Sequence, residues 1–139
     1  MSGREFVDTN ILVYAYDRSS GTKHERARKL VDQLWESGNG TVSTQVLQEF
    51  VVYLRHKVAH PLSAQETRRV LQDFMGWNVF VNTAQSILQA LEIAERYQIS
   101  FWDALIIQAA EGTGAEILYT EDLSHGQIYG DVRVVNPFK

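Results

Sequence analysis

The sequence predicts an α/β protein, a three-layer α/β/α sandwich around a short-stranded, mainly parallel sheet of four or five strands. Short apolar runs alternate with longer segments of helical periodicity, a pattern typical of parallel sheets that are covered by helices on both faces. Hydrophobic residues make up 45% of the 139 residues and charged residues 22%, values that favour one globular domain over 1–139. Ligands of such sheets bind outside the carboxyl ends of the strands.

The first half of the chain is expected to hold two strands and three helices. REFVD (4–8) is a short apolar run that predicts the first strand, and a helix opens directly after it. Apolar residues at helical spacing predict a second helix over 24–35. A short strand at 41–42 precedes a third helix, for which Ser43 or Thr44 is the N-cap.

The middle of the chain carries two further helix starts. Ser63 and Glu66 match a capping box, and the helix that they open runs to about Met75. WNVFV (77–81) predicts a short buried strand, and Thr83 caps the next helix. The residues of that helix expected to point inward are Ala84, Ile87, Leu88, Leu91 and Ala94.

The last third repeats the pattern. Ser100 begins another box-like helix start, and that helix ends at the glycines of 112–114. EILYT (116–120) and RVV (133–135) predict the final two strands. Strands and helices therefore alternate to the end of the chain, and no linker or repeat indicates a second domain.

Composition excludes several classes of function. Cysteine is absent, which excludes disulfides, thiolate metal sites and thiol nucleophiles. Arg4 and Glu5 come too early in the sequence for a signal peptide. No segment reaches the roughly 18 apolar residues needed to span a membrane, so we expect a soluble, cytoplasmic protein. The net charge of −4 counts against a simple DNA-binding module, but not against an acidic pocket that metal ions neutralise.

Four acids lie at the boundaries of predicted elements: Asp8, Glu49, Asp103 and Asp122. In a parallel sheet these positions can meet at the edge where ligands bind. Crowded carboxylates repel one another and take up protons unless a cation joins them. Mg²⁺ and Mn²⁺ suit carboxylate and water ligands, and such ions promote the hydrolysis of phosphate esters.

Each acid also has a purely structural interpretation. Asp8 is a favoured N-cap residue for the helix that follows it. Glu49 fits a solvated helix position, Asp103 could close a capping box with Ser100, and Asp122 fits a turn. The apolar neighbours of Asp8 and Asp103 favour the site over these alternatives, because an unpaired charge among core residues is costly.

Several blocks of the sequence together resemble PIN-domain ribonucleases, and most closely the VapC-type toxins of bacterial toxin–antitoxin pairs. The blocks are FVDTNILVYAYD (6–17), STQVLQEF (43–50), SFWDALIIQAA (100–110), LYTEDLSHGQ (118–127) and the terminal VRVVNPF (132–138). They follow the order of that family and span nearly the whole chain.

The resemblance implies a site and its ions. Its acidic quartet, which would hold one or two Mg²⁺ or Mn²⁺ ions, corresponds to Asp8, Glu49, Asp103 and Asp122. Its outer residues, which would orient these acids through hydrogen bonds, correspond to Thr9, Asn10 and Thr120. Glu121 adds a fifth acid, so either Glu121 or Asp122 is the last metal contact.

The resemblance also implies an activity and partners. The activity would be endonucleolytic hydrolysis of single-stranded or loop RNA by a metal-activated water. The partners would be the RNA substrate, a small antitoxin protein and a second copy of the chain, with no membrane involved.

Local basic clusters are the candidates for holding RNA. The foremost are Arg26, Arg28, Lys29, Arg55 and Lys57, with Arg68 and Arg69 as a further pair. By contrast, the aromatic residues Tyr14, Tyr16, Trp35, Trp77 and Trp102 are interpreted as core.

Two rival functions remain open from the sequence. An aspartate-nucleophile phosphatase would place its nucleophile at Asp8, but such enzymes carry a second acid two residues later, where this chain has Asn10. The other rival is a catalytically silent PIN-like binding module that works only through its partners.

Overall fold

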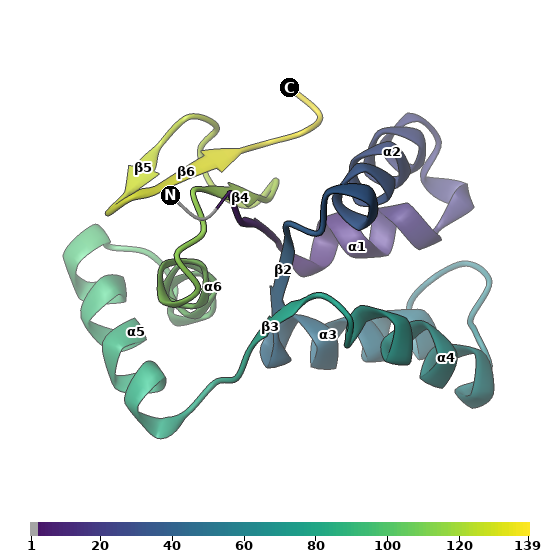
Figure 1. Ribbon diagram of the computed structural model, residues 1–139, viewed down its shortest axis with the longest axis horizontal. Helices are drawn as coiled ribbons and strands as arrows, with labels where there is room; N and C mark the ends of the chain where they lie inside the picture. The colour runs from purple at the N-terminus through teal and green to yellow at the C-terminus, as the bar shows by residue number, and fades with distance from the viewer. Residues whose placement is uncertain (1–2) are drawn as a thin grey trace.

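The computed structural model describes residues 3–139, so the first two residues of the expected domain lie outside the described range. Figure 1 shows a central sheet with α1 and α2 on one side and α5 and α6 on the other. In the described residues the strands are β1 (Glu5–Val7), β2 (Gly40–Ser43), β3 (Asn78–Phe80), β4 (Ile117–Tyr119), β5 (Ile128–Tyr129) and β6 (Val132–Val135). The three-layer α/β sandwich is thereby confirmed.

The helices alternate with these strands as the sequence predicted. They are α1 (Thr9–Tyr16), α2 (Thr22–Ser37), α3 (Thr44–His56), α4 (Ala64–Phe74), α5 (Ala84–Tyr97) and α6 (Phe101–Gly112), with a 3₁₀ turn η1 (Arg18–Ser20) between α1 and α2. None of the helices in the described range is long and apolar enough to cross a membrane.

The strand order of the sheet is β3-β2-β1-β4-β6-β5. The neighbours β3, β2, β1, β4 and β6 pair in parallel, and β5 pairs antiparallel with β6 at one edge. The described residues thus form six strands, against the four or five expected. The additional strand, Ile128–Tyr129, is too short to show the alternation of apolar and polar residues by which a strand is predicted. A turn at Gly130, with a positive φ of 59°, joins it to β6.

β1 lies in the middle of the sheet and fixes the position of Asp8. Phe6 and Val7 are fully buried, as expected of a parallel strand covered on both faces. β1 pairs with β2 on one side and β4 on the other, and the Asp8 backbone N–H donates to the Tyr119 carbonyl at 3.0 Å. Asp8 is therefore held at the centre of the carboxyl edge.

The predicted helix caps are confirmed. Ser43 caps α3, and Ser63 forms a capping box with Glu66 at the start of α4. Thr83 caps α5 and forms a further box with Ser86. At α6, Ser100 accepts a hydrogen bond from the Asp103 backbone N–H at 3.1 Å, which fixes the first turn of that helix.

The predicted inward face of α5 is wrong. Ala84, Ile87, Leu88 and Leu91 are exposed and Ala94 is partly buried, whereas the buried positions of the helix are Ser86, Ala90 and Ile93. α5 lies beside α6 (Figure 1), and residues as small as serine and alanine allow this close packing. Ile87, Leu88 and Leu91 therefore face away from the core.

The predicted strand at 77–81 is also less buried than expected. Trp77 is buried, but Asn78, Val79 and Phe80 are only partly buried and Val81 is exposed. The reason is that β3 pairs only with β2, at the edge of the sheet opposite β5.

Candidate active site

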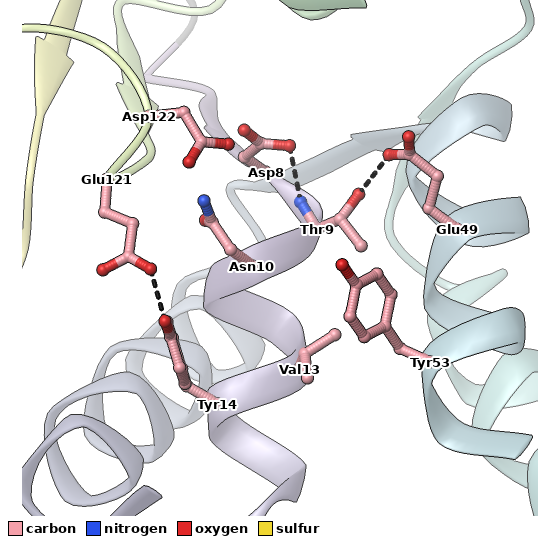
Figure 2. A pocket seen from close by; sticks show the side chains of 9 residues that line it. All are labelled: Asp8, Thr9, Asn10, Val13, Tyr14, Glu49, Tyr53, Glu121 and Asp122. Carbon is pink, nitrogen blue, oxygen red and sulfur yellow. Dashed lines mark hydrogen bonds between the residues drawn. The ribbon is translucent and has the colours of Figure 1, made fainter. Parts of the chain in front are cut away.

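Three of the four predicted acids line one pocket at the carboxyl edge of the sheet. Asp8 directly follows β1, Asp122 lies three residues after β4, and Glu49 lies in the second turn of α3, the helix that follows β2. The pocket has a volume of about 330 Å³ and is lined by Asp8, Thr9, Asn10, Val13, Tyr14, Glu49, Tyr53, Glu121 and Asp122. Figure 2 shows the carboxylates of Asp8 and Asp122 side by side and that of Glu49 facing Thr9.

Asp8 is a buried carboxylate whose two oxygens accept hydrogen bonds from neutral groups. It is 7% exposed. The Thr9 backbone N–H donates to Oδ1 at 2.7 Å and the Thr120 hydroxyl donates to Oδ2 at 2.8 Å. The pKa of Asp8 is raised to about 7, mainly by burial and in part by the charges of Asp122 and Glu49, and the two hydrogen bonds offset only part of this rise. Asp8 thus caps α1 and also forms part of the acidic pocket.

Thr9 and Thr120 connect the acids to one another. The Thr9 hydroxyl donates to Glu49 Oε1 at 2.7 Å, while its backbone N–H binds Asp8. Thr120 is fully buried; its hydroxyl donates to Asp8 and accepts from the Asp122 backbone N–H at 3.1 Å. Each threonine therefore holds two acids in a fixed relation.

Asn10 and Asp122 face each other across the pocket (Figure 2). Burial raises the pKa of Asp122, as do the charges of Asp103, Glu121 and Glu49, while the nearby Asn10 amide lowers it. Yet neither Asn10 Nδ2 nor Oδ1, both buried, reaches a partner at hydrogen-bond geometry. A buried amide without partners is costly, so a bound ligand that paired with the Asn10 amide would remove this cost.

Glu121 makes different contacts from those of Asp122. It accepts a short hydrogen bond from the Tyr14 hydroxyl, and Lys23 Nζ lies 2.8 Å from Oε2. Burial raises the pKa of Glu121, but the bonds from Lys23 and Tyr14 outweigh that effect and hold it below its ordinary value. Glu121 already has a cation, so Asp122 is the better candidate for the last metal contact.

These contacts give a test that separates the two neighbouring acids. Asp122→Asn is expected to weaken Mn²⁺ binding by at least about tenfold, whereas Glu121→Gln leaves the affinity within about twofold. Isothermal titration calorimetry of the two variants and the wild type measures the difference. Equal losses in both variants would show that the fifth acid also binds the ion.

The structure does not place Asp103 among the residues that line this pocket. Asp103 lies in the first turn of α6 and is partly buried. Its charge nonetheless raises the pKa of Asp122, so the two carboxylates are close enough to interact. Of the four predicted acids, Asp8, Glu49 and Asp122 therefore line one pocket, and Asp103 lies near Asp122 outside that lining.

The donor set fits a divalent cation that keeps other ligands. The pocket supplies carboxylate oxygens, the partnerless amide of Asn10 and a carboxyl group with a pKa near 7 that no cation pairs with in the described residues. Among residues 3–139, no three acidic or histidine side chains lie close enough to enclose a metal by themselves. Protein sites for Mg²⁺ commonly use one or two carboxylates, with water and substrate phosphates in the remaining positions.

The predicted basic residues are spread over the surface. Arg26, Arg28 and Lys29 are exposed on α2, where Arg28 pairs with Asp32 at 3.3 Å and lies 5.4 Å from the Tyr16 ring centroid. Arg55 is partly buried at the end of α3, and Arg68 and Arg69 are exposed on α4. Lys57 is the one in this predicted set whose charged group contacts a residue lining the pocket, with Nζ 5.1 Å from the Tyr53 ring centroid.

Some aromatic residues differ from their predicted role. Trp77 is buried against Phe74 as expected of a core residue, but Trp35, which packs on the same ring, is 38% exposed and Trp102 is 63% exposed. Tyr14 lines the pocket, and Tyr53, which the sequence interpretation missed, also lines it. The available signal was its position four residues after Glu49, on the same face of a helix.

Comparison with known proteins identifies the fold family. The family model of the PIN domain matches residues 6–130. The chain belongs to the PIN domain family. No curated protein matches the chain by sequence.

Solved structures share this PIN fold at low sequence identity. A toxin–antitoxin complex from Klebsiella pneumoniae is 18% identical over 97% of this chain and 98% of that one, with a TM-score of 0.72. VapC20 of Mycobacterium tuberculosis, a toxin described as cleaving the sarcin–ricin loop, is 22% identical over 84% and 88%, with a TM-score of 0.63. DNA-bound VapBC from Salmonella typhimurium is 18% identical over 94% and 96%, with a TM-score of 0.63.

Proposed function

We propose that this PIN domain is a metal-dependent endoribonuclease, the toxin component of a toxin–antitoxin pair that acts in the cytoplasm. The observation that carries the proposal is the buried Asp8, whose pKa is about 7, beside Glu49 and Asp122 in one open pocket. Asp8 caps α1, but its buried charge is costly to the fold unless a ligand compensates it.

Asp8 and Asp122 would hold Mg²⁺ or Mn²⁺, with Asp103 beside them. When bound, such an ion polarises a phosphate and lowers the pKa of a water molecule. The protein's own contribution is positioning: Thr120 holds Asp8 and the Asp122 backbone, and Thr9 holds Glu49. Glu49 keeps Oε2 as an acceptor for a proton of the attacking water.

The proposed partners are RNA and an antitoxin protein. Support for the antitoxin comes from the folds of the toxin–antitoxin complexes from Klebsiella and Salmonella, which align with nearly all of this chain. Support for a nucleic-acid substrate comes from VapC20, which is described as a toxin that cleaves the sarcin–ricin loop. The acidic pocket would also accept a basic side chain of the antitoxin in place of the metal ion.

The exposed apolar face of α5 supports a homodimer. Ile87, Leu88 and Leu91 lie within one and a half turns of each other and are all exposed. Leu88→Glu is expected to shift the protein from dimer to monomer in light scattering, while Glu92→Gln, on the same helix, leaves the mass unchanged. A wild-type protein that is monomeric at high micromolar concentration would refute the homodimer.

The nuclease is tested with a labelled structured RNA and Mn²⁺. The expected result is a set of defined cuts that need the ion, are absent in EDTA and leave 5′-phosphate ends. A covalent phospho-aspartate on Asp8 would instead indicate a phosphatase. No cuts with any divalent ion or RNA would favour the binding module.

A further inference from the structure

A second set of side chains continues the acidic pocket along α3. Tyr53 follows Glu49 by one turn of helix, and Lys57, the cap residue that ends α3, follows Tyr53 by another four residues. Tyr53 is 40% exposed and lines the pocket. Figure 2 shows its ring projecting from α3 into the space that faces Val13 of α1.

We propose that Tyr53 and Lys57 form a nucleotide shelf, on which Tyr53 stacks against an unpaired RNA base and Lys57 contacts a phosphate next to it. This inference rests on the proposed nuclease function and names the part of the substrate that lies beside the acids. Tyr53 and Lys57 are positioning residues for the RNA.

The two ends of the pocket differ in chemistry, which favours a base over a phosphate at Tyr53. The carboxylates of Asp8, Glu49 and Asp122 form one end, while Val13 and the Tyr53 ring form an apolar end between α1 and α3. An aromatic ring with an accessible surface offers a flat partner to any base, because every base has a π-face. The volume of about 330 Å³ is at the lower end for small-ligand pockets, which suits one nucleotide.

Lys57 provides a positive charge beside the Tyr53 ring. Its ammonium group lies 5.1 Å from the Tyr53 ring centroid, and it makes no ion pair with an acid in the described part of the chain. In contrast, Arg28 pairs with Asp32 and Lys23 with Glu121. Lys57 is thus available to a phosphate one nucleotide away from a base stacked on Tyr53.

The shelf requires an unpaired base. In a duplex both faces of each base already stack on neighbours, so a protein ring gains access only in single strands, loops and bulges. Binding that depends on Tyr53 is therefore expected for single-stranded RNA and not for the same sequence in a duplex.

The test measures binding separately from cleavage. Fluorescence anisotropy follows a labelled single-stranded RNA, and the same RNA annealed to its complement, with Asp8→Asn protein in Mg²⁺. Adding Tyr53→Leu is expected to weaken single-strand binding by about tenfold, with duplex binding little changed, and Tyr53→Trp is expected to restore it. Thermal melting shows that each variant is folded.

Lys57 is tested by the salt dependence of binding. Lys57→Gln is expected to reduce the slope of log K against log salt by about 0.7 for single-stranded RNA, the value for one phosphate contact. The matched control is Arg96→Gln, because Arg96 also lies near a tyrosine ring, 5.9 Å from the Tyr97 centroid, but on α5. This control is expected to leave the slope unchanged.

The outcomes separate the two proposals. Single-strand affinity within about twofold of the parent in Tyr53→Leu overturns the shelf, and does so even where the wild type cleaves RNA. A Tyr53-dependent affinity in a wild type that cleaves no RNA supports the shelf and overturns the nuclease. A wild type that neither binds nor cleaves either RNA overturns both.

Discussion

Asp8→Asn is expected to reduce metal-dependent RNA cleavage by more than about 100-fold. Removing a residue that only orients a metal ligand costs about 10–100-fold in activity, and removing a ligand itself is expected to cost more. Asp8 is the most deeply buried of the acids that line the pocket, and Glu49 and Asp122 are both close enough to raise its pKa. The amide retains the size of the side chain but provides one neutral oxygen in place of a charged carboxylate. Single-turnover cleavage of a labelled RNA in Mn²⁺ measures the loss.

Two further variants show whether the loss is specific. Thr120→Val removes the hydroxyl that binds Asp8 and is expected to lower the rate by about 10–100-fold, while Thr120→Ser retains most of it. Asp131→Asn, an exposed acid beyond β5, controls for the change in net charge. Cleavage by Asp8→Asn within about tenfold of the wild type would contradict the role of Asp8.

The second large effect concerns stability without metal. The pKa of Asp8 is about 7 in the folded protein and 3.8 as an unperturbed group, so between these pH values the folded state binds more protons than the unfolded state. The free energy of unfolding therefore falls as the pH rises from about 4 to 7, and the full penalty is present above about pH 7. The contribution of Asp8 is at most about 4 kcal/mol.

This effect is measured by urea unfolding in EDTA at about pH 4.5 and about pH 7.5, comparing the wild type with Asp8→Asn. Other acids also titrate in this range, so the informative quantity is the difference in unfolding free energy between the two proteins. Asp8→Asn is expected to gain stability relative to the wild type as the pH rises, and Mg²⁺ is expected to close the gap by stabilising the wild type. A variant that is clearly less stable in chelator at the higher pH would refute the crowding of the acids.

The sequence predicted those parts of the fold that local chemistry determines. Ser43, Ser63, Thr83 and Ser100 all cap helices, because a hydroxyl before a helical run satisfies orphan backbone N–H groups wherever the helix later packs. The apolar run that ends at Asp8 predicted the first strand and the acid after it, but not the central place of that strand in the sheet.

Features that depend on packing between distant segments could not be predicted in this way. Leu88 and Leu91 look like core residues, but α5 packs against α6 through Ala90 and Ile93. Tyr53 looks like any tyrosine of an amphipathic helix until Glu49 is placed in a pocket. Likewise, the sequence alone left Glu121 and Asp122 equivalent, and the distinction depends on Lys23, 98 residues from Glu121.

The central position of β1 has a consequence for control of the proposed nuclease. Asp8 is bonded to β4 through its backbone and to Thr120 through its side chain, so moving it out of place would mean breaking apart the middle of the sheet. An inhibitor of this protein is therefore expected to cover the acidic pocket without changing the positions of its side chains. Dissociation of that inhibitor would restore full activity without any refolding.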